Sequence, residues 1–188
     1  MLENLMNLVK ENAGEAIINN PAIPNERNDD VIAESSQSIT SGLQGMLAGG
    51  GLKDVLQLFS GQANMDQSNP VVQNLSGGLT GNLVNKFGLD QQKAGGIAGS
   101  LIPSVLKNLV SKTNDPSDNG FDLQNIFNTL SGGKTQGANI GALVNKFTQG
   151  RFDKDGDGDT DLQDVMAMLS GNKENNSGVF DTVKGLFN

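Results

Sequence analysis

Apolar residues in this chain recur at helical spacing, and no stretch alternates apolar and polar residues as a half-buried strand does. The clearest case is a short pattern that begins at Leu52 and returns at Leu123 and Leu162. Each copy has apolar residues at i, i+3, i+4 and i+7 and closes with Ser-Gly, where glycine can take the left-handed conformation that ends a helix. The pattern predicts three short amphipathic helices. Their similarity indicates either a shared structural unit or no more than similar helix ends.

Prolines and glycines divide the rest of the chain into longer helices. We expect these helices over 2–18, from about Asp30 to the glycine run 49–51, and from Pro70 to Phe87. Another helix is predicted after Asp90, whose side chain can cap the first turn. Pro103 lies inside it and is expected to kink the helix or to break it near Leu101, because proline removes a backbone hydrogen bond.

This last helix has an apolar side and, near its start, a group of small residues. The apolar side consists of Ala94, Ile97, Ala98, Leu101, Val105 and Leu109. The small residues are Ala94, Gly95, Gly96, Ala98 and Gly99. They indicate that another helix packs closely there. The core of the same chain is the expected partner, and a second copy of the protein is the alternative.

The composition excludes several classes of function. The chain has no Cys and no His, so disulfides, thiolate or imidazole metal sites and Ser–His or Cys–His catalysis are impossible. It has no Trp and no Tyr to hold a sugar beside paired carboxylates. Basic residues are not concentrated as nucleic-acid binding requires, and no apolar run approaches the length of a membrane span. We therefore expect no enzyme activity, no nucleic-acid partner and no membrane span.

The first residues, MLENLMNLVKENAGEAII, show helical spacing with charged residues interleaved. They lack the basic region and the unbroken apolar run of a secretory signal. A cytoplasmic protein is the default expectation, with export by a route that needs no such signal left open.

Negative charge is concentrated in the segment DKDGDGDTDLQD at 153–164. The whole chain has a net charge of −8; six aspartates and one lysine give this segment −5, which leaves −3 for the rest. Carboxylates this close together repel one another, and a hard divalent cation that needs six to eight oxygen ligands explains why they gather. An acidic, solvated linker is the alternative.

This segment resembles the calcium loop of EF-hand and dockerin-type repeats. Such a loop takes oxygen ligands from positions 1, 3, 5, 7, 9 and 12 and has glycine at position 6. Counted from the first aspartate, position 6 is Gly158, and the ligand positions hold Asp153, Asp155, Asp157, Asp159, Asp161 and Asp164. The resemblance implies that Asp159 offers its backbone carbonyl and that Asp161 binds directly or through a water.

Helices are predicted on both sides of this segment, as in a helix–loop–helix hand. The helix before it carries Ile140, Leu143, Val144 and Phe147 at helical spacing, and the third copy of the short pattern follows it. Two positions depart from most EF-hands. Asp164 replaces a bidentate glutamate, as in dockerin-type loops, which leaves Mg2+ as an alternative to Ca2+. Thr160 replaces the large aliphatic residue through which two loops usually pair.

A second, degenerate loop appears when Leu123 is aligned with Leu162, which places 114–125 opposite 153–164. Positions 1, 5, 9 and 12 then hold Asn114, Asp118, Asp122 and Asn125, and position 8 holds Phe121. Pro116 at position 3 has no ligand atom, and Asn119 replaces the turn glycine. This half-hand is expected to support the other loop without binding metal. An ordinary polar loop between helices is the alternative.

A turn, an Ala-rich helix and a later proline mark the middle of the chain, at about 67–133. The residues of this pattern are Phe87, Gly88, Leu89, Asp90, Ala94, Leu101, Pro103 and Leu109. The pattern is similar to that of the YidB-like family of bacterial proteins, which are small, all-helical and of unassigned function. The resemblance implies a bacterial origin and a helical fold, and it implies no active site.

Together these patterns predict an all-α, multihelical chain with a YidB-like helical core and a C-terminal EF-hand helix–loop–helix. The expected segments are N-terminal helices (1–66), the YidB-like region (67–134), the calcium-binding unit (135–172) and a C-terminal docking helix (173–188). The expected function is non-enzymatic calcium binding, in which Ca2+ orders the 153–164 loop and stabilises the fold. A static staple is the favoured role of the ion, and a switch is the alternative. The alternative is a self-associating structural protein, a filament or lattice subunit. The glycine-rich helix faces support it, as does a tail that must dock on its own core or on a second copy.

Overall fold

The computed structural model describes residues 2–49, 51–115, 117–118, 120–133 and 139–148. Within these ranges the regular structure is entirely helical, so the all-α class is confirmed for them. The chain forms two compact units. The first contains the residues up to Leu43 together with Asn64–Phe121, and the second contains Gln44–Ala63 and the described residues from Asp122 onward.

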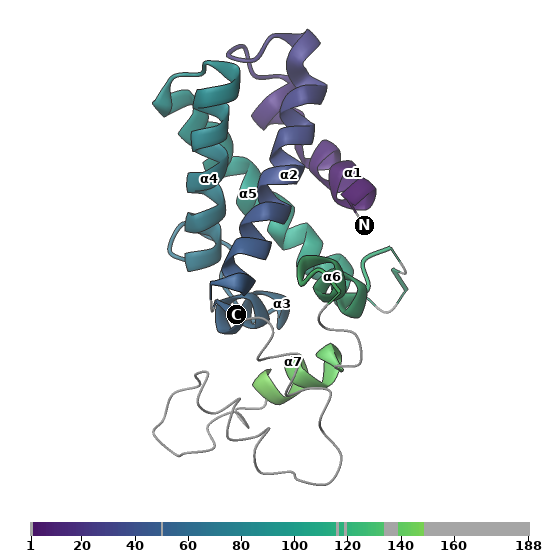
Figure 1. The fold of residues 1–188 in the computed structure, drawn as a ribbon. Coiled ribbons are helices and arrows are strands. Elements are labelled where there is room, and N and C mark those ends of the chain that lie inside the picture. The colour runs from purple at the N-terminus through teal and green to yellow at the C-terminus, as the bar shows by residue number, and fades with distance from the viewer. Residues whose placement is uncertain (1, 50, 116, 119, 134–138, 149–188) are drawn as a thin grey trace, which may run out of the picture. The chain divides into compact units, whose positions relative to one another are not determined.

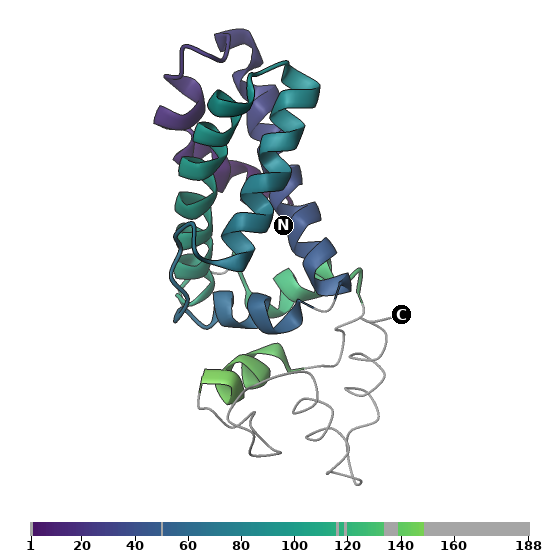
Figure 2. The same ribbon diagram turned by 90° about the vertical axis from the view of Figure 1, so that its left-hand side faces the viewer.

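The first unit is built around two long antiparallel helices, α4 and α5, which run side by side (Figures 1 and 2). Helix α1 and the π-helical turn η1 pack on α5. The elements of this unit are α1 (Leu2–Asn12), η1 (Gly14–Ile18), the 3-10 turn η2 (Asn25–Arg27), the greater part of α2 (Asn28–Ala48), α4 (Pro70–Phe87) and α5 (Gln91–Thr113).

The first helix is shorter than the sequence predicts. It ends at Asn12, where the side-chain amide donates a hydrogen bond of 2.7 Å to the carbonyl of Leu8. A side chain that bonds to the backbone competes with helix continuation, and Gly14 is a poor helix former. The chain then makes a wider turn, in which the N–H of Ile18 reaches back to the carbonyl of Ala13. The single helix expected over 2–18 is therefore wrong beyond Asn12.

Helix α4 begins and ends where the sequence predicts. The side chain of Asn69 accepts hydrogen bonds from the first backbone N–H groups, and Pro70 occupies the first turn, where its missing N–H costs nothing. Gly88, with φ of 68°, ends the helix in the left-handed conformation. Asp90 then caps α5 by accepting a hydrogen bond of 2.9 Å from the N–H of Lys93, as predicted. The apolar side predicted for α5 is buried.

Pro103 does not break α5, which is helical from Gln91 to Thr113. Proline has no N–H, so the carbonyl four residues earlier, that of Gly99, lacks its helical donor. The side-chain amide of Gln67 donates a hydrogen bond of 3.2 Å to that carbonyl. The break expected near Leu101 is wrong, because a side chain from outside the helix satisfies the group that the proline leaves open.

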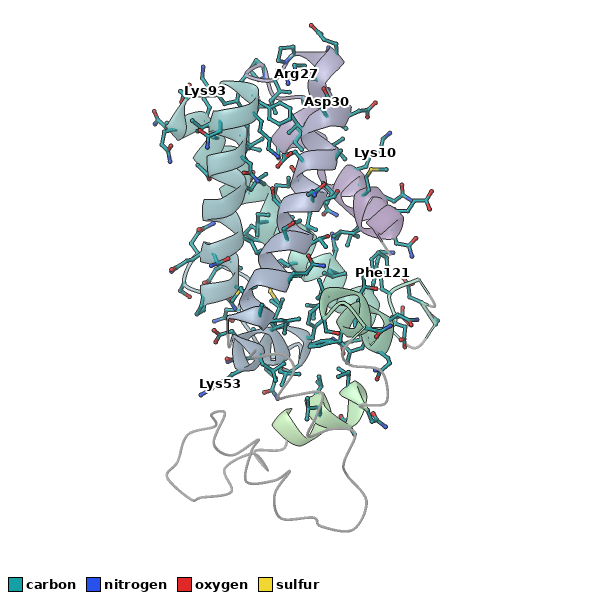
Figure 3. The ribbon with its side chains drawn as sticks, in the orientation of Figure 1. Lys10, Arg27, Asp30, Lys53, Lys93 and Phe121 are labelled. Atoms are coloured by element: carbon teal, nitrogen blue, oxygen red, sulfur yellow. The ribbon has the colours of Figure 1, made fainter. Side chains whose placement is uncertain are left out.

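Helix α2, up to Leu43, lies antiparallel to α4. The contacts that define this arrangement join Glu34 to Lys86, Ser38 to Asn82, and Gly42 to Leu75. At the beginning of α2 the guanidinium of Arg27 stacks over the ring of Phe87 at 4.6 Å, and Arg27 also lies near Asp30 (Figure 3). Several small hydroxyl side chains of α2 are buried: Ser35, Ser36, Ser38 and Thr40.

The small residues of α5 divide into two groups. Ala94 and Ala98 are buried, as expected for a face against the core. A methyl group added at Gly95 or Gly96 would meet no atom within 4 Å, and one at Gly99 would meet only the side chain of Gln67. The prediction that another helix packs closely against these glycines is therefore wrong for the described part of the chain.

The second unit contains the first two copies of the short pattern as helices, α3 (Leu52–Phe59) and α6 (Leu123–Leu130), together with α7 (Ile140–Thr148). Both copies end as predicted, since Gly61 and Gly132 have φ of 74° and 63°. The rings of Phe59 and Phe127 meet edge to face at 5.5 Å, and α7 packs against α3 and α6. The third copy, from Leu162, and the C-terminal segment lie outside the described residues.

Across the described ranges, no helix combines the length and the apolar character that crossing a membrane would require.

Candidate metal centre

The six predicted metal ligands lie outside the residues that the structure describes. They are Asp153, Asp155, Asp157, Asp159, Asp161 and Asp164. The structure therefore neither brings them together nor separates them. What it does describe is α7, the helix that precedes them in the chain.

Helix α7 confirms the predicted helical spacing of Ile140 and Val144, whose side chains are both buried. The side chain of Asn139 caps its first turn by accepting a hydrogen bond of 2.8 Å from the N–H of Ala142. The N–H of Ile140 donates to the side-chain oxygen of Gln124 at 3.1 Å, which links the beginning of α7 to α6. The helix that leads toward 153–164 is thus anchored in the second unit at its first turn.

Three of the four ligand positions of the predicted half-hand have side chains with contacts inside the fold, and the fourth, Asn125, contributes its backbone N–H to one of them. Asn114 follows α5, and its side-chain amide donates to the carbonyl of Val110 at 2.9 Å. Asp122 caps α6 by accepting from the N–H of Asn125 at 2.9 Å. Asp118 accepts from the N–H of Gly120 at 2.9 Å.

Asp118 also forms an ion pair with a lysine of the same chain. Its second carboxylate oxygen lies 3.4 Å from the ammonium nitrogen of Lys112. The same ammonium lies 5.7 Å from the centre of the Phe121 ring, which is buried. Figure 3 labels Phe121. Lys112 was not among the predicted site residues, although a basic residue in the last turn of a helix directly before an acidic loop is a signal that the sequence contains.

Two other acidic side chains, Glu34 and Asp90, also have partners within the protein. Within the described ranges no three acidic side chains gather where an ion could bind. Glu34 pairs with Lys86 at 2.7 Å, and Asp90 is a helix cap.

Hydrogen bonding lowers the pKa of three exposed aspartates below the ordinary value. Hydrogen bonds from the hydroxyl and the backbone N–H of Ser68 lower the pKa of Asp66. The corresponding groups of Ser117 lower the pKa of Asp115, and the positive charge of Lys112 adds a smaller attraction. The backbone N–H of Lys93 is the main cause of the lowered pKa of Asp90. Each shift has a local cause, and none indicates a metal-binding or acid–base site.

Comparison with family models, with curated proteins and with solved structures finds no match for this chain. Both resemblances therefore depend on the residues of the chain itself.

Proposed function

We propose that this chain is a non-enzymatic calcium-binding helical protein in which Ca2+ orders the 153–164 loop and stabilises the fold. One observation carries the proposal: aspartate stands at all six ligand positions of an EF-hand loop, with Gly158 at the turn position. In a loop without an ion these carboxylates would repel one another. A divalent cation bound between them attracts each carboxylate and outweighs that repulsion. Mg2+ is the competing ion, because Asp164 has a shorter side chain than glutamate.

Two features of the described residues support this proposal. Helix α7, which leads toward the loop, is capped by Asn139 and has a buried apolar face. The first two copies of the short pattern are amphipathic helices that end at left-handed glycines. The third copy, from Leu162, is the exit helix of the proposed hand, and the same sequence pattern favours a helix there.

The proposed role of the ion is structural. An ion that binds only the folded chain adds about 2.7 kcal/mol to the free energy of unfolding when its concentration is a hundredfold above the dissociation constant. That amount is a substantial part of the stability of a typical domain. A static staple is the role we favour for the ion, and a switch is the alternative.

Calorimetric titration of chelator-stripped protein tests the proposal. Ca2+ is added first to the wild type and then to a variant with Asp153→Ala and Asp157→Ala, and both titrations are repeated with Mg2+. We expect saturable binding of one Ca2+ by the wild type and none by the variant. Equal heats from the two proteins would show that the metal assignment is wrong.

The same proposal includes a helical core similar to that of the YidB-like family. The resemblance includes the turn from Phe87 to Asp90, and in the structure Gly88 ends α4 while Asp90 caps α5. This geometry supports a compact helical hairpin in the region of the resemblance. The resemblance implies no active site, and a non-enzymatic role remains part of the proposal.

A second candidate function is a self-associating structural protein, such as a filament or lattice subunit. One observation favours it: a methyl group added at Gly77, Gly78, Gly95 or Gly96 would meet nothing within 4 Å. These helical glycines have no packing role within the described residues, and a second copy could approach closely there. Light scattering over a range of concentrations, with and without Ca2+, tests this candidate. A constant particle mass under all conditions would exclude it.

A further inference from the structure

The loop between α5 and α6 contains several aspartates, as the proposed calcium loop does, but here each described carboxylate already has partners. Asp115 accepts hydrogen bonds from the N–H and the hydroxyl of Ser117. Asp118 accepts from the N–H of Gly120 at 2.9 Å. Its other oxygen faces the Lys112 ammonium at 3.4 Å.

Lys112 is held beside this loop by the fold. It lies in the last turn of α5, and its ammonium is 5.7 Å from the centre of the Phe121 ring, within reach of a cation–π attraction. The Lys112 and Asp118 side chains are 38% and 24% exposed, so water screens the pair only in part. Asn4 of α1 donates a hydrogen bond of 2.8 Å to the carbonyl of Gly120, which links this residue to the first helix.

We propose that the Lys112 ammonium is the built-in counter-cation of Asp118, so that the hydrogen bond from the N–H of Gly120 to Asp118 forms without a metal ion. The comparison with 153–164 depends on the proposed function, whereas the contacts of Lys112 do not. The proposed calcium loop has six aspartates and one lysine, Lys154. Its negative charge is therefore balanced by binding a cation from solution. In the earlier loop a single ammonium beside Asp118 does what a metal ion would do. One loop of the chain then responds to calcium, and the other does not.

Hydrogen exchange of the Gly120 amide, followed by NMR, tests this proposal, because that N–H donates to Asp118. In the wild type we expect the same protection in chelator and in millimolar Ca2+. Lys112→Met keeps a long apolar side chain over Phe121 and removes the charge. This variant should exchange the Gly120 amide about two- to fivefold faster in chelator, as expected for the loss of a partly exposed ion pair.

Three further measurements distinguish the effect of the Lys112 charge on the Gly120 exchange rate from the effect of side-chain packing. Lys107→Met, at an exposed lysine of the same helix, should leave the exchange rate unchanged. Asp118→Asn, which keeps an acceptor for Gly120, should raise the rate as Lys112→Met does, and it gives the answer if the lysine variant fails to fold. High salt should raise the wild-type rate toward that of Lys112→Met, because ions screen a partly exposed pair.

Two results would overturn the proposal. The first is that the Gly120 amide exchanges at the same rate in Lys112→Met, in Asp118→Asn and in the control variant Lys107→Met. The other is a wild-type amide that becomes protected only when Ca2+ is added. Because the decisive comparison is made in chelator, it is independent of calcium binding at 153–164. Failure of the calorimetric titration would remove the proposed function and leave this result standing.

Discussion

The side chain of Gln67 donates a hydrogen bond of 3.2 Å to the backbone carbonyl of Gly99, a group that α5 itself cannot satisfy. Pro103, four residues later, has no N–H to offer, so this partly exposed carbonyl takes its hydrogen bond from a donor outside the helix. Gln67 precedes α4, so a residue far away in the sequence supplies the donor. This contact explains how a proline stands in the middle of an unbroken helix.

Replacement of Gln67 by alanine should therefore lower the free energy of unfolding by about 1 kcal/mol, the usual net value of one hydrogen bond. In a Pro103→Ala background the restored N–H bonds to Gly99, and the same Gln67→Ala change should cost little. Urea denaturation of the four proteins in a double-mutant cycle measures this coupling. An equal cost in both backgrounds would contradict the role given to Gln67.

Two glycines in neighbouring helices should respond to alanine in opposite directions. A methyl group at Gly42 would overlap Cδ2 of Leu75, whose side chain is buried and would have to shift within the core, so Gly42→Ala should lose about 1–3 kcal/mol through overpacking. A methyl group at Gly77 meets nothing within 4 Å, and Gly77→Ala should gain about 0.5–1 kcal/mol because alanine favours the helix. Thermal unfolding of both variants provides the comparison. A stabilised Gly42→Ala would refute the close contact between α2 and α4.

The cap of α5 makes stability depend on pH. The N–H of Lys93 lowers the pKa of Asp90 in the folded chain below its ordinary value of 3.8. The ionised carboxylate therefore contributes stability that is fully present above that ordinary value and is lost as the pH falls through the lower folded pKa. Compared with Asp90→Asn, the wild type should be more stable near neutral pH. The difference should vanish in acid, as measured by urea denaturation at several pH values. A difference that stays constant with pH would contradict the pKa shift.

Calcium should raise the melting temperature of the whole chain if the proposed loop binds it. At a hundredfold excess over the dissociation constant, a gain of about 2.7 kcal/mol corresponds to a rise of about 5–10 °C for a chain of this size. The Asp153→Ala, Asp157→Ala variant should show no such rise.

The last ligand position offers a test of ion preference. Asp164→Glu supplies the longer side chain that binds Ca2+ through both oxygens, while Mg2+ requires a tighter octahedral site. This variant should therefore bind Ca2+ more tightly relative to Mg2+ than the wild type does, which competition titrations measure. An unchanged preference would argue against Asp164 as a ligand.

Much of the local structure of this chain could be read from its sequence. Helix α4 runs from Pro70 to Phe87 as predicted, because Asn69 and Gly88 carry the start and stop signals within a few residues of the helix. The helices that begin at Leu52 and Leu123 were predictable for the same reason. The six aspartates of the proposed calcium loop are likewise a purely local pattern, and their arrangement in space stays a prediction.

What the sequence alone determined is therefore where most helices lie, the ends of α3, α4 and α6, and the identity of the candidate metal ligands, since each depends on residues close together in the chain. Only the tertiary structure decided that α5 continues through Pro103 and that Lys112 faces Asp118. It also decided that no described part of the chain packs against added methyl groups at Gly95 and Gly96. The hydrogen bond from Gln67 and the lack of such packing within the described residues depend on which helices become neighbours. That choice follows from packing of the whole chain, and no local pattern encodes it.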